Sequence, residues 1–317
     1  MVMGRQHHRT VVVRAAAGMA AAVTVTASLA GCTPTKPPKD QLAEITAVTG
    51  NQIFAIEVMA GGATKGETVS VSTTRNGTTS SYAYDDGKVT DQGSFNPPVG
   101  MLMDVGAFPS IDTLAELAKT TAKEEDNCSP AKAHATTTPS GAIATWAECF
   151  NGQEPVEGKT TLNGQPFVVP ALDLTTAQSY TAIDQAVTQL LGSPNISHIQ
   201  YDLQRSQIII TPEETVNTQG EPCYTSITAS TTQPTTPLPL ICFGNVGQEP
   251  FALNDYDSTT IATTITDLQN SPHIDTTALS SITFTSDGHT LHWEANSHNL
   301  ADRKDKKQYL EGNIPKR

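Results

Sequence analysis

The densest group of possible metal ligands lies near the end of the chain and comprises His289, His292, Glu294 and His298. A zinc site needs three such side chains converging on one ion. The spacing argues against convergence, because residues 289 and 292 are three apart and point to opposite faces of a strand. His292 and Glu294 share the face opposite Trp293. We therefore expect Trp293 to face the core and these side chains to face water, without a metal.

The chain also lacks local signatures of catalysis. It contains no G-x-S-x-G, no H-E-x-x-H and no glycine-rich phosphate loop. Gln-Glu-Pro occurs twice, around Glu154 and Glu249, and both carboxylates are candidates for binding. A structural role is favoured, because each copy follows a cysteine and its proline suits the end of an edge strand. We expect no catalytic residue and no cofactor, and thus a protein that is not an enzyme.

The first 32 residues predict export of the chain to the cell envelope. Arg5, Arg9 and Arg14 precede a small-residue apolar run from 15 to 28. The run is too short to span a bilayer, which takes roughly 20 residues. Leu29-Ala30-Gly31-Cys32 then resembles the lipobox of bacterial envelope lipoproteins. The resemblance implies cleavage before Cys32 and acylation of its thiol, often with another chain on its amine, and two or more chains anchor stably.

The residues after Cys32 predict how the globular part of the chain is attached to the membrane. Three prolines between residues 33 and 39 favour an extended spacer of roughly 20 Å. Removing the signal takes three basic residues and no acidic one, so the formal charge falls from −13 to −16. Such a charge repels phosphate backbones and anionic headgroups. We expect no nucleic-acid partner, and contact with the membrane only through the lipid.

Four cysteines remain once Cys32 is acylated: Cys128, Cys149, Cys223 and Cys242. An even number outside the cytoplasm predicts disulfides, and three pairings are formally possible. A metal site is disfavoured, because no C-x-x-C spacing exists and the nearest histidine, His134, stands alone. The midpoints of 128–149 and 223–242 both fall in turn-like segments. Two hairpins, each closed by its own disulfide, are therefore predicted, each stabilised by about 3 kcal/mol in the chain-entropy model.

The segment after each cysteine pair is similar. Cys149-Phe150-Asn151-Gly152-Gln153-Glu154-Pro155 recurs at 242–250 with two residues inserted, and a helix and two strands follow each copy. Repetition of this kind indicates one supersecondary unit used more than once. We predict an α+β fold of antiparallel sheets with helices packed on one face. Its repeated unit would be a helix, a hairpin and a disulfide-closed hairpin.

Turn and capping signals place the elements. Helices are expected from Asp40 to Gly50, from Ser110, from Thr176 to Gly192 and from Ser258 or Thr259. Asn-Gly and Asp-Gly pairs predict hairpin turns at 76–77 and 86–87. The predicted organisation is a signal peptide at 1–31, an acylated cysteine and tether at 32–39, a first α+β domain at 40–155, a linker at 156–165, a second α+β domain at 166–300 and a charged tail at 301–317.

Two functions fit these features best, and an extracytoplasmic enzyme without a local signature is a third, less favoured class. One is a non-enzymatic interaction or accessory lipoprotein of the cell envelope, on its extracytoplasmic face, with an unknown envelope protein as partner. The alternative is a carrier whose sheet lines a cavity for lipid or another apolar ligand. A contiguous apolar cavity of several hundred Å³ would favour the carrier. The alanine- and threonine-rich composition is typical of actinobacterial envelope proteins.

Overall fold

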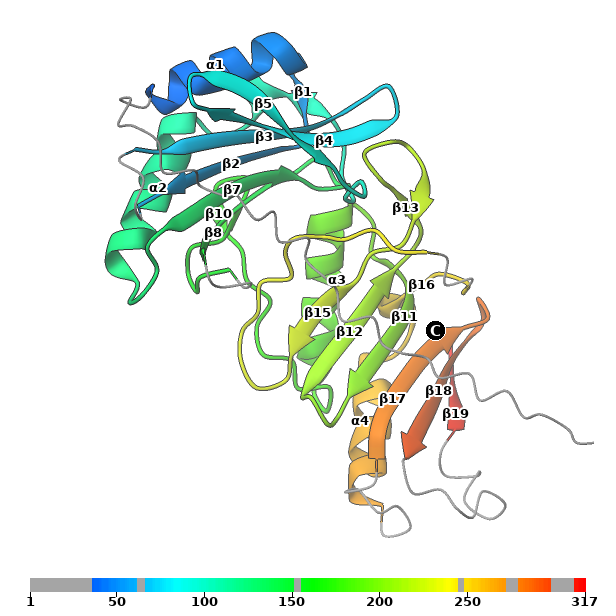
Figure 1. Ribbon diagram of the computed structural model, residues 1–317. Helices are drawn as coiled ribbons and strands as arrows, with labels where there is room; N and C mark the ends of the chain where they lie inside the picture. Colours follow the sequence, from blue (N-terminus) through cyan, green and yellow to red (C-terminus); the bar gives the residue numbers. More distant parts are fainter. Residues whose placement is uncertain (1–35, 62–65, 151–154, 245–247, 272–278, 298–310) are drawn as a thin grey trace, which may run out of the picture. The chain divides into compact units, whose positions relative to one another are not determined.

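Two antiparallel sheets with helices packed against them make up the described part of the chain. The computed structural model describes residues 36–61, 66–150, 155–244, 248–271, 279–297 and 311–317 (Figure 1). Four α-helices occur in these residues, and every strand pair between named strands is antiparallel. The predicted α+β class with antiparallel sheets is confirmed.

The first sheet has eight strands in the order β10-β9-β8-β7-β2-β3-β4-β5. Their bounds are β2 Ala55–Ala60, β3 Thr68–Arg75, β4 Thr78–Asp85, β5 Lys88–Ser94, β7 Ala131–Thr137, β8 Ile143–Cys149, β9 Thr161–Leu162 and β10 Gln165–Pro166. The predicted turns join β3 to β4 and β4 to β5. Asn76 and Asp86 adopt positive φ angles of 50° and 47° there, which asparagine and aspartate tolerate better than most residues.

Helices α1 (Pro38–Thr49) and α2 (Ile111–Glu124) cover one face of this sheet. Strands β2 and β3 alternate buried and half-buried residues, so that Ile56 and Val71 lie in a core with Ile45 of α1 and Leu114 of α2. The Ser110 hydroxyl accepts a hydrogen bond from the Thr113 N–H and caps α2 as the sequence predicts. The opposite face of the sheet carries the polar positions of the same strands.

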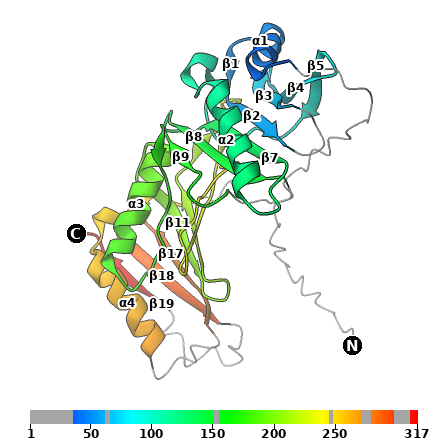
Figure 2. The same cartoon turned by 90° about the vertical axis from the view of Figure 1, so that its left-hand side faces the viewer.

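The second sheet has the order β15-β12-β11-β17-β18-β19, and β16 also pairs with β11. The bounds of its strands are β11 Asn195–Asp202, β12 Gln207–Pro212, β15 Ile227–Ser230, β16 Phe251–Ala252, β17 Leu279–Ser286, β18 Thr290–Ser297 and β19 Glu311–Pro315. Helices α3 (Ala177–Leu191) and α4 (Ser258–Asn270) run along one side of β11, β17 and β18 (Figure 2). Ile183, Ile265 and Phe284 are among the residues of their shared core.

Short elements complete the chain. They are the two-residue strand pairs β1 (Gln52–Ile53) with β6 (Met103–Asp104) and β13 (Thr215–Val216) with β14 (Pro222–Cys223), and the 3₁₀ turns η1 (Val105–Ala107) and η2 (Leu253–Asp255). The two sheets belong to one compact unit, Thr33–Arg317. Their division into two domains at 156–165 stays a prediction.

Several element boundaries differ from the predicted ones. Helix α1 begins at Pro38 rather than Asp40, because proline fits the first helical turn, where its missing N–H has no partner to lose. Strands β9 and β10 extend the first sheet within or beside the predicted linker. Strand β19 pairs with β18, so the last part of the predicted charged tail belongs to the second sheet. The charged run at 302–307 lies outside the described residues.

Candidate functional site

The four cysteines of the body lie in two pairs at disulfide distance. The Cα atoms of Cys128 and Cys149 are 4.6 Å apart, and those of Cys223 and Cys242 are 5.7 Å apart. Both separations fall in the range of roughly 4.4–6.8 Å that a disulfide needs. These are the two local pairs favoured by the sequence, and paired cysteines are consistent with an extracytoplasmic location.

The first pair closes a hairpin, but its register differs from the predicted one. Placing Cys128 directly opposite Cys149 would set His134 opposite Ile143. In the structure Ala131 pairs with Cys149, and His134 pairs with Trp146. Cys128 therefore lies before the first residue of β7, outside the ladder, and bonds to Cys149 at the end of β8.

The second pair does not close a hairpin, and this prediction is wrong. Strand β14, which contains Cys223, pairs with β13, whereas β15 pairs with β12. Only an isolated bridge between Tyr224 and Phe243 joins the neighbourhoods of the two cysteines in the described residues. Three prolines between 234 and 239 explain the difference, because each lacks the N–H that a ladder requires. The disulfide-closed hairpin consequently does not recur as the repeat predicts.

Several predicted site residues lie outside the described part of the chain. These are Cys32, Glu154 and His298. Glu249 is described but belongs to no helix or strand. Within the described residues, no group of three or more histidine, cysteine or acidic side chains is arranged to hold a metal ion.

His292 and Glu294 occupy the sheet face that the sequence predicts. Leu291 and Ala295 are buried on the other face, and Trp293 packs against the same core. The His292 ring lies between two acceptors: its Nε2 is 3.2 Å from Asp287 Oδ2, and its Nδ1 hydrogen-bonds to Asn313 Oδ1. Backbone N–H groups of His289 and Thr290, with the His292 ring, lower the pKa of Asp287 to about 2. These contacts join the β17–β18 turn to β18, and β18 to β19.

A cluster of charged side chains that the sequence analysis missed lies on the first sheet. We call it the His134 cluster and define it as Glu57, Lys132, His134, Trp146 and Glu148. Its residues come from β2, β7 and β8 and share the face opposite α1 and α2. Cross-strand pairing sets them side by side, because His134 lies opposite Glu57 on one side and opposite Trp146 on the other.

The imidazole of His134 has a carboxylate at each nitrogen. Its Nδ1 is 3.5 Å from Glu57 Oε2, and its Nε2 is 3.1 Å from Glu148 Oε1. Lys132 Nζ is 3.2 Å from Glu57 Oε2 and 4.0 Å from Glu148 Oε1. The buried ring of Trp146 stacks on the imidazole, with centroids 4.8 Å apart and planes 13° apart. The four polar side chains are thus held in one fixed arrangement.

Electrostatics favour the charged form of Glu148. Burial works to raise its pKa, but the hydrogen bond and charge of His134 and the charge of Lys132 outweigh burial. The pKa of this carboxyl therefore lies below its ordinary value. The neighbours of His134 at ion-pair distance are the carboxylates of Glu57 and Glu148.

The same face continues over β3, β4 and β5 as a surface of small residues. Its positions, related by cross-strand pairing to Glu57 and Ala55, are Ser70, Ser72, Ser81, Ala83 and Thr90. The sequence could not single out this surface, because isolated serines and threonines signal nothing until the strand order is known. Helices α1 and α2 pack against the opposite face of these strands.

Two further features bear on function. A hollow on α2, lined by Asp112, Thr113, Glu116, Leu117 and Thr120, is shallow and open to solvent. None of the helices in the described ranges is long and apolar enough to cross a membrane.

Comparison with known proteins gives no family. No protein-family model and no curated protein matches the chain. Among solved structures, a PCNA2–PCNA3 complex from Sulfolobus tokodaii aligns at 9% identity and a TM-score of 0.16, over 88% of this chain and 96% of that chain. The beta clamp of H. pylori in complex with 5-chloroisatin aligns at 10% identity and a TM-score of 0.12, over 83% of this chain and 54% of that chain. Scores this low carry no argument about fold or activity.

Proposed function

We propose that this chain is a lipid-anchored extracytoplasmic lipoprotein that acts without catalysis, as an interaction or accessory protein of the bacterial cell envelope. Its anchor is Cys32, acylated after cleavage at the lipobox-like Leu29-Ala30-Gly31-Cys32. Its binding surface is the face of the first sheet that carries the His134 cluster. The partner is another component of the envelope.

The tether supports an anchored arrangement. Five residues lie between Cys32 and Pro38, the first residue of α1. An extended chain of that length reaches at most about 20 Å. Two of these five residues are prolines, which favour extension. An acylated Cys32 would therefore keep α1 close to the headgroups, and the strongly acidic body would not lie flat on them.

The observation that carries the binding role is the fixed geometry of the His134 cluster. Two carboxylates, an imidazole and an ammonium group sit on neighbouring strands of one sheet, with side chains that are 16–33% exposed. Charged groups that are already ordered lose little further freedom when a partner binds. They fix the register of a polar interface and disfavour wrong partners.

The carrier alternative has less support. A carrier for lipid needs an enclosed apolar cavity. The hollow on α2 is open, and two carboxylates, Asp112 and Glu116, stand among its lining residues. Both sheets also bury apolar cores against their helices. These features favour the interaction protein.

A repeated helix–hairpin unit is a separate part of the proposal. Helix α3 precedes the hairpin β11–β12, and α4 precedes β17–β18. In the first sheet α2 precedes β7–β8, and β7 pairs with β2 much as β17 pairs with β11. This order supports one unit used several times, without the second disulfide-closed hairpin.

Site-specific photo-cross-linking in the native envelope tests the binding face. A photoreactive residue at Ser72 or Ala83 should give one discrete cross-linked envelope component, and Glu148→Gln in the same chain should reduce its yield. A photoreactive residue at Glu116, exposed on α2, is the matched control and should not capture that component. Equal capture from Glu116, or capture from there alone, would place the interface elsewhere.

A further inference from the structure

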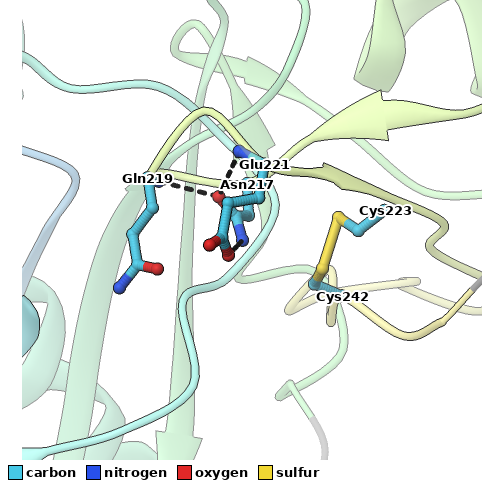
Figure 3. Close-up of a disulfide and its surroundings, with 5 residues drawn as sticks. All are labelled: Asn217, Gln219, Glu221, Cys223 and Cys242. Atoms are coloured by element: carbon cyan, nitrogen blue, oxygen red, sulfur yellow. Dashed lines mark hydrogen bonds between the residues drawn. A yellow bond between two sulfur atoms is a disulfide. The ribbon is translucent and has the colours of Figure 1, made fainter. Parts of the chain in front are cut away.

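The short hairpin β13–β14 is held by side-chain hydrogen bonds around its turn. Asn217 Oδ1 accepts from the backbone N–H groups of Gln219 and Glu221, at 2.8 and 3.0 Å (Figure 3). Asn217 Nδ2 donates to Glu221 Oε2 at 3.0 Å. Each strand of the hairpin is only two residues long. A hairpin this small is not stable by itself in water.

The tip of this hairpin contacts the first sheet. Gln219 Nε2 donates to the carbonyl of Gly77 at 2.9 Å and lies 3.2 Å from Thr79 Oγ1. The Thr218 N–H donates to the carbonyl of Pro98 at 3.1 Å, and Thr74 donates to the Thr218 hydroxyl. The hairpin is therefore a docking arm that links the turn between β3 and β4 to the chain of the second sheet.

One covalent bond holds the base of the arm. Cys223 is the last residue of β14 and is bonded to Cys242, as Figure 3 shows. In the described part of this segment, the strand pairing beside Cys242 is a single bridge between Tyr224 and Phe243. Without the disulfide, the base would be held by two ladder pairs between β13 and β14, by this bridge, by a second bridge between Asn217 and Val99, and by the packing of Cys223 in the core of the second sheet.

The other cysteine pair stands in a different setting. Cys149 lies in β8, which forms seven ladder pairs with β7. That hairpin lies inside the eight-stranded sheet, between β2 and β9. Opening Cys128–Cys149 would therefore leave its hairpin paired on both sides.

We propose that the Cys223–Cys242 disulfide is a redox-controlled clasp for this docking arm. An extracytoplasmic dithiol would reduce it by thiol–disulfide exchange, in which two electrons and two protons pass to Cys223 and Cys242 and the dithiol becomes a disulfide. The sulfur–sulfur bond breaks and two thiols form. The arm then leaves the first sheet, and the backbone carbonyls of Gly77 and Pro98 lose their partners.

Hydrogen exchange of the whole chain tests the clasp. In the double variant Cys223→Ser/Cys242→Ser, the amides of Thr218, Gln219 and Glu221 should exchange at least about ten-fold faster than in the parent. The matched double variant Cys128→Ser/Cys149→Ser should leave these three amides unchanged. Unchanged exchange in the first variant, or equal acceleration in both, would overturn the proposal.

A titration of the parent chain with dithiothreitol serves if a double variant fails to fold. Alkylation and peptide mapping at each step report which disulfide has opened. Exchange at Thr218 and Gln219 should rise in step with the appearance of free Cys223 and Cys242. Exchange that rises only with the opening of Cys128–Cys149 would contradict the clasp.

Discussion

Gly312 of β19 lies directly against the indole ring of Trp293 on β18. A Cβ atom built at position 312 would come within 2.6 Å of three ring atoms, which is closer than carbon atoms approach. Only glycine lets the last strand pass over this ring. The contact holds β19 against β18, and just after β19 ion pairs join Lys316 to Asp255 of η2 and Arg317 to Asp257 at the start of α4.

Gly312→Ala should therefore lower the free energy of unfolding by about 1–3 kcal/mol, because the added methyl group forces Trp293 or β19 to move. Thermal unfolding measures the loss, and a shift in the tryptophan emission maximum reports the displaced ring. Gly244→Ala is the control, because a Cβ there meets nothing within 4 Å. Equal stability of the two variants would contradict the contact.

Glu148 gives a prediction that depends on pH. Its pKa is lowered in the folded chain, so its charged form contributes stability above the ordinary carboxyl pKa, and this contribution disappears as the pH falls through the lowered value. Glu148→Gln should destabilise the chain at pH 7 by about 1 kcal/mol. The difference should shrink toward zero in strongly acidic solution. Glu116→Gln, at an exposed position, should show neither effect.

Asp184 on α3 should behave in the opposite sense. Burial raises its pKa to about 6, against hydrogen bonds from the backbone of Leu253 and Asn254. A raised pKa means that the neutral form is favoured in the folded state, so stability is greatest at low pH and falls as the pH rises through 6. Asp184→Asn should therefore stabilise the chain at pH 7.5, by about 1 kcal/mol after allowance for the partial exposure of the side chain.

Chemical denaturation of parent and Asp184→Asn at pH 4 and pH 7.5 checks this sign. The two chains should differ at pH 7.5 and be nearly equal at pH 4. A difference of the same size at both pH values would mean that packing, rather than charge, sets the contribution of Asp184.

The two disulfides are open to a direct chemical test. Peptide mapping without reduction should return Cys128 linked to Cys149 and Cys223 linked to Cys242, as their Cα separations allow. A peptide linking Cys128 to Cys242 would be incompatible with the described fold.

Local signals in the sequence predicted most elements of the fold. Asn76-Gly77 and Asp86-Gly87 predicted two hairpins, and Ser110 and Gly192 marked helix ends, because these residues act within a few positions of themselves. The arrangement between Cys223 and Cys242 was not predicted, because Pro234, Pro237 and Pro239 lack the N–H groups that a hairpin ladder needs and β15 pairs with β12 instead. Strand β19 was not predicted because a charged segment separates it in the sequence from its partner, β18.

The His134 cluster shows why site prediction was harder than fold prediction. Glu57 and His134 are far apart in the sequence and meet only because β2 pairs with β7. His134 and Glu148 meet because the β7–β8 ladder is shifted from the register that the cysteine midpoint suggests. Nothing in the residue types alone specifies either pairing.

Acylation of Cys32 is the central claim, and metabolic labelling with a clickable palmitate analogue tests it most directly. The full chain should carry the label and partition into the detergent phase of Triton X-114. Cys32→Ala should accumulate as unlabelled precursor, because neither the lipid nor the cleavage that follows it can occur. A parent chain that matures without any label, or a variant labelled as strongly as the parent, would contradict the account.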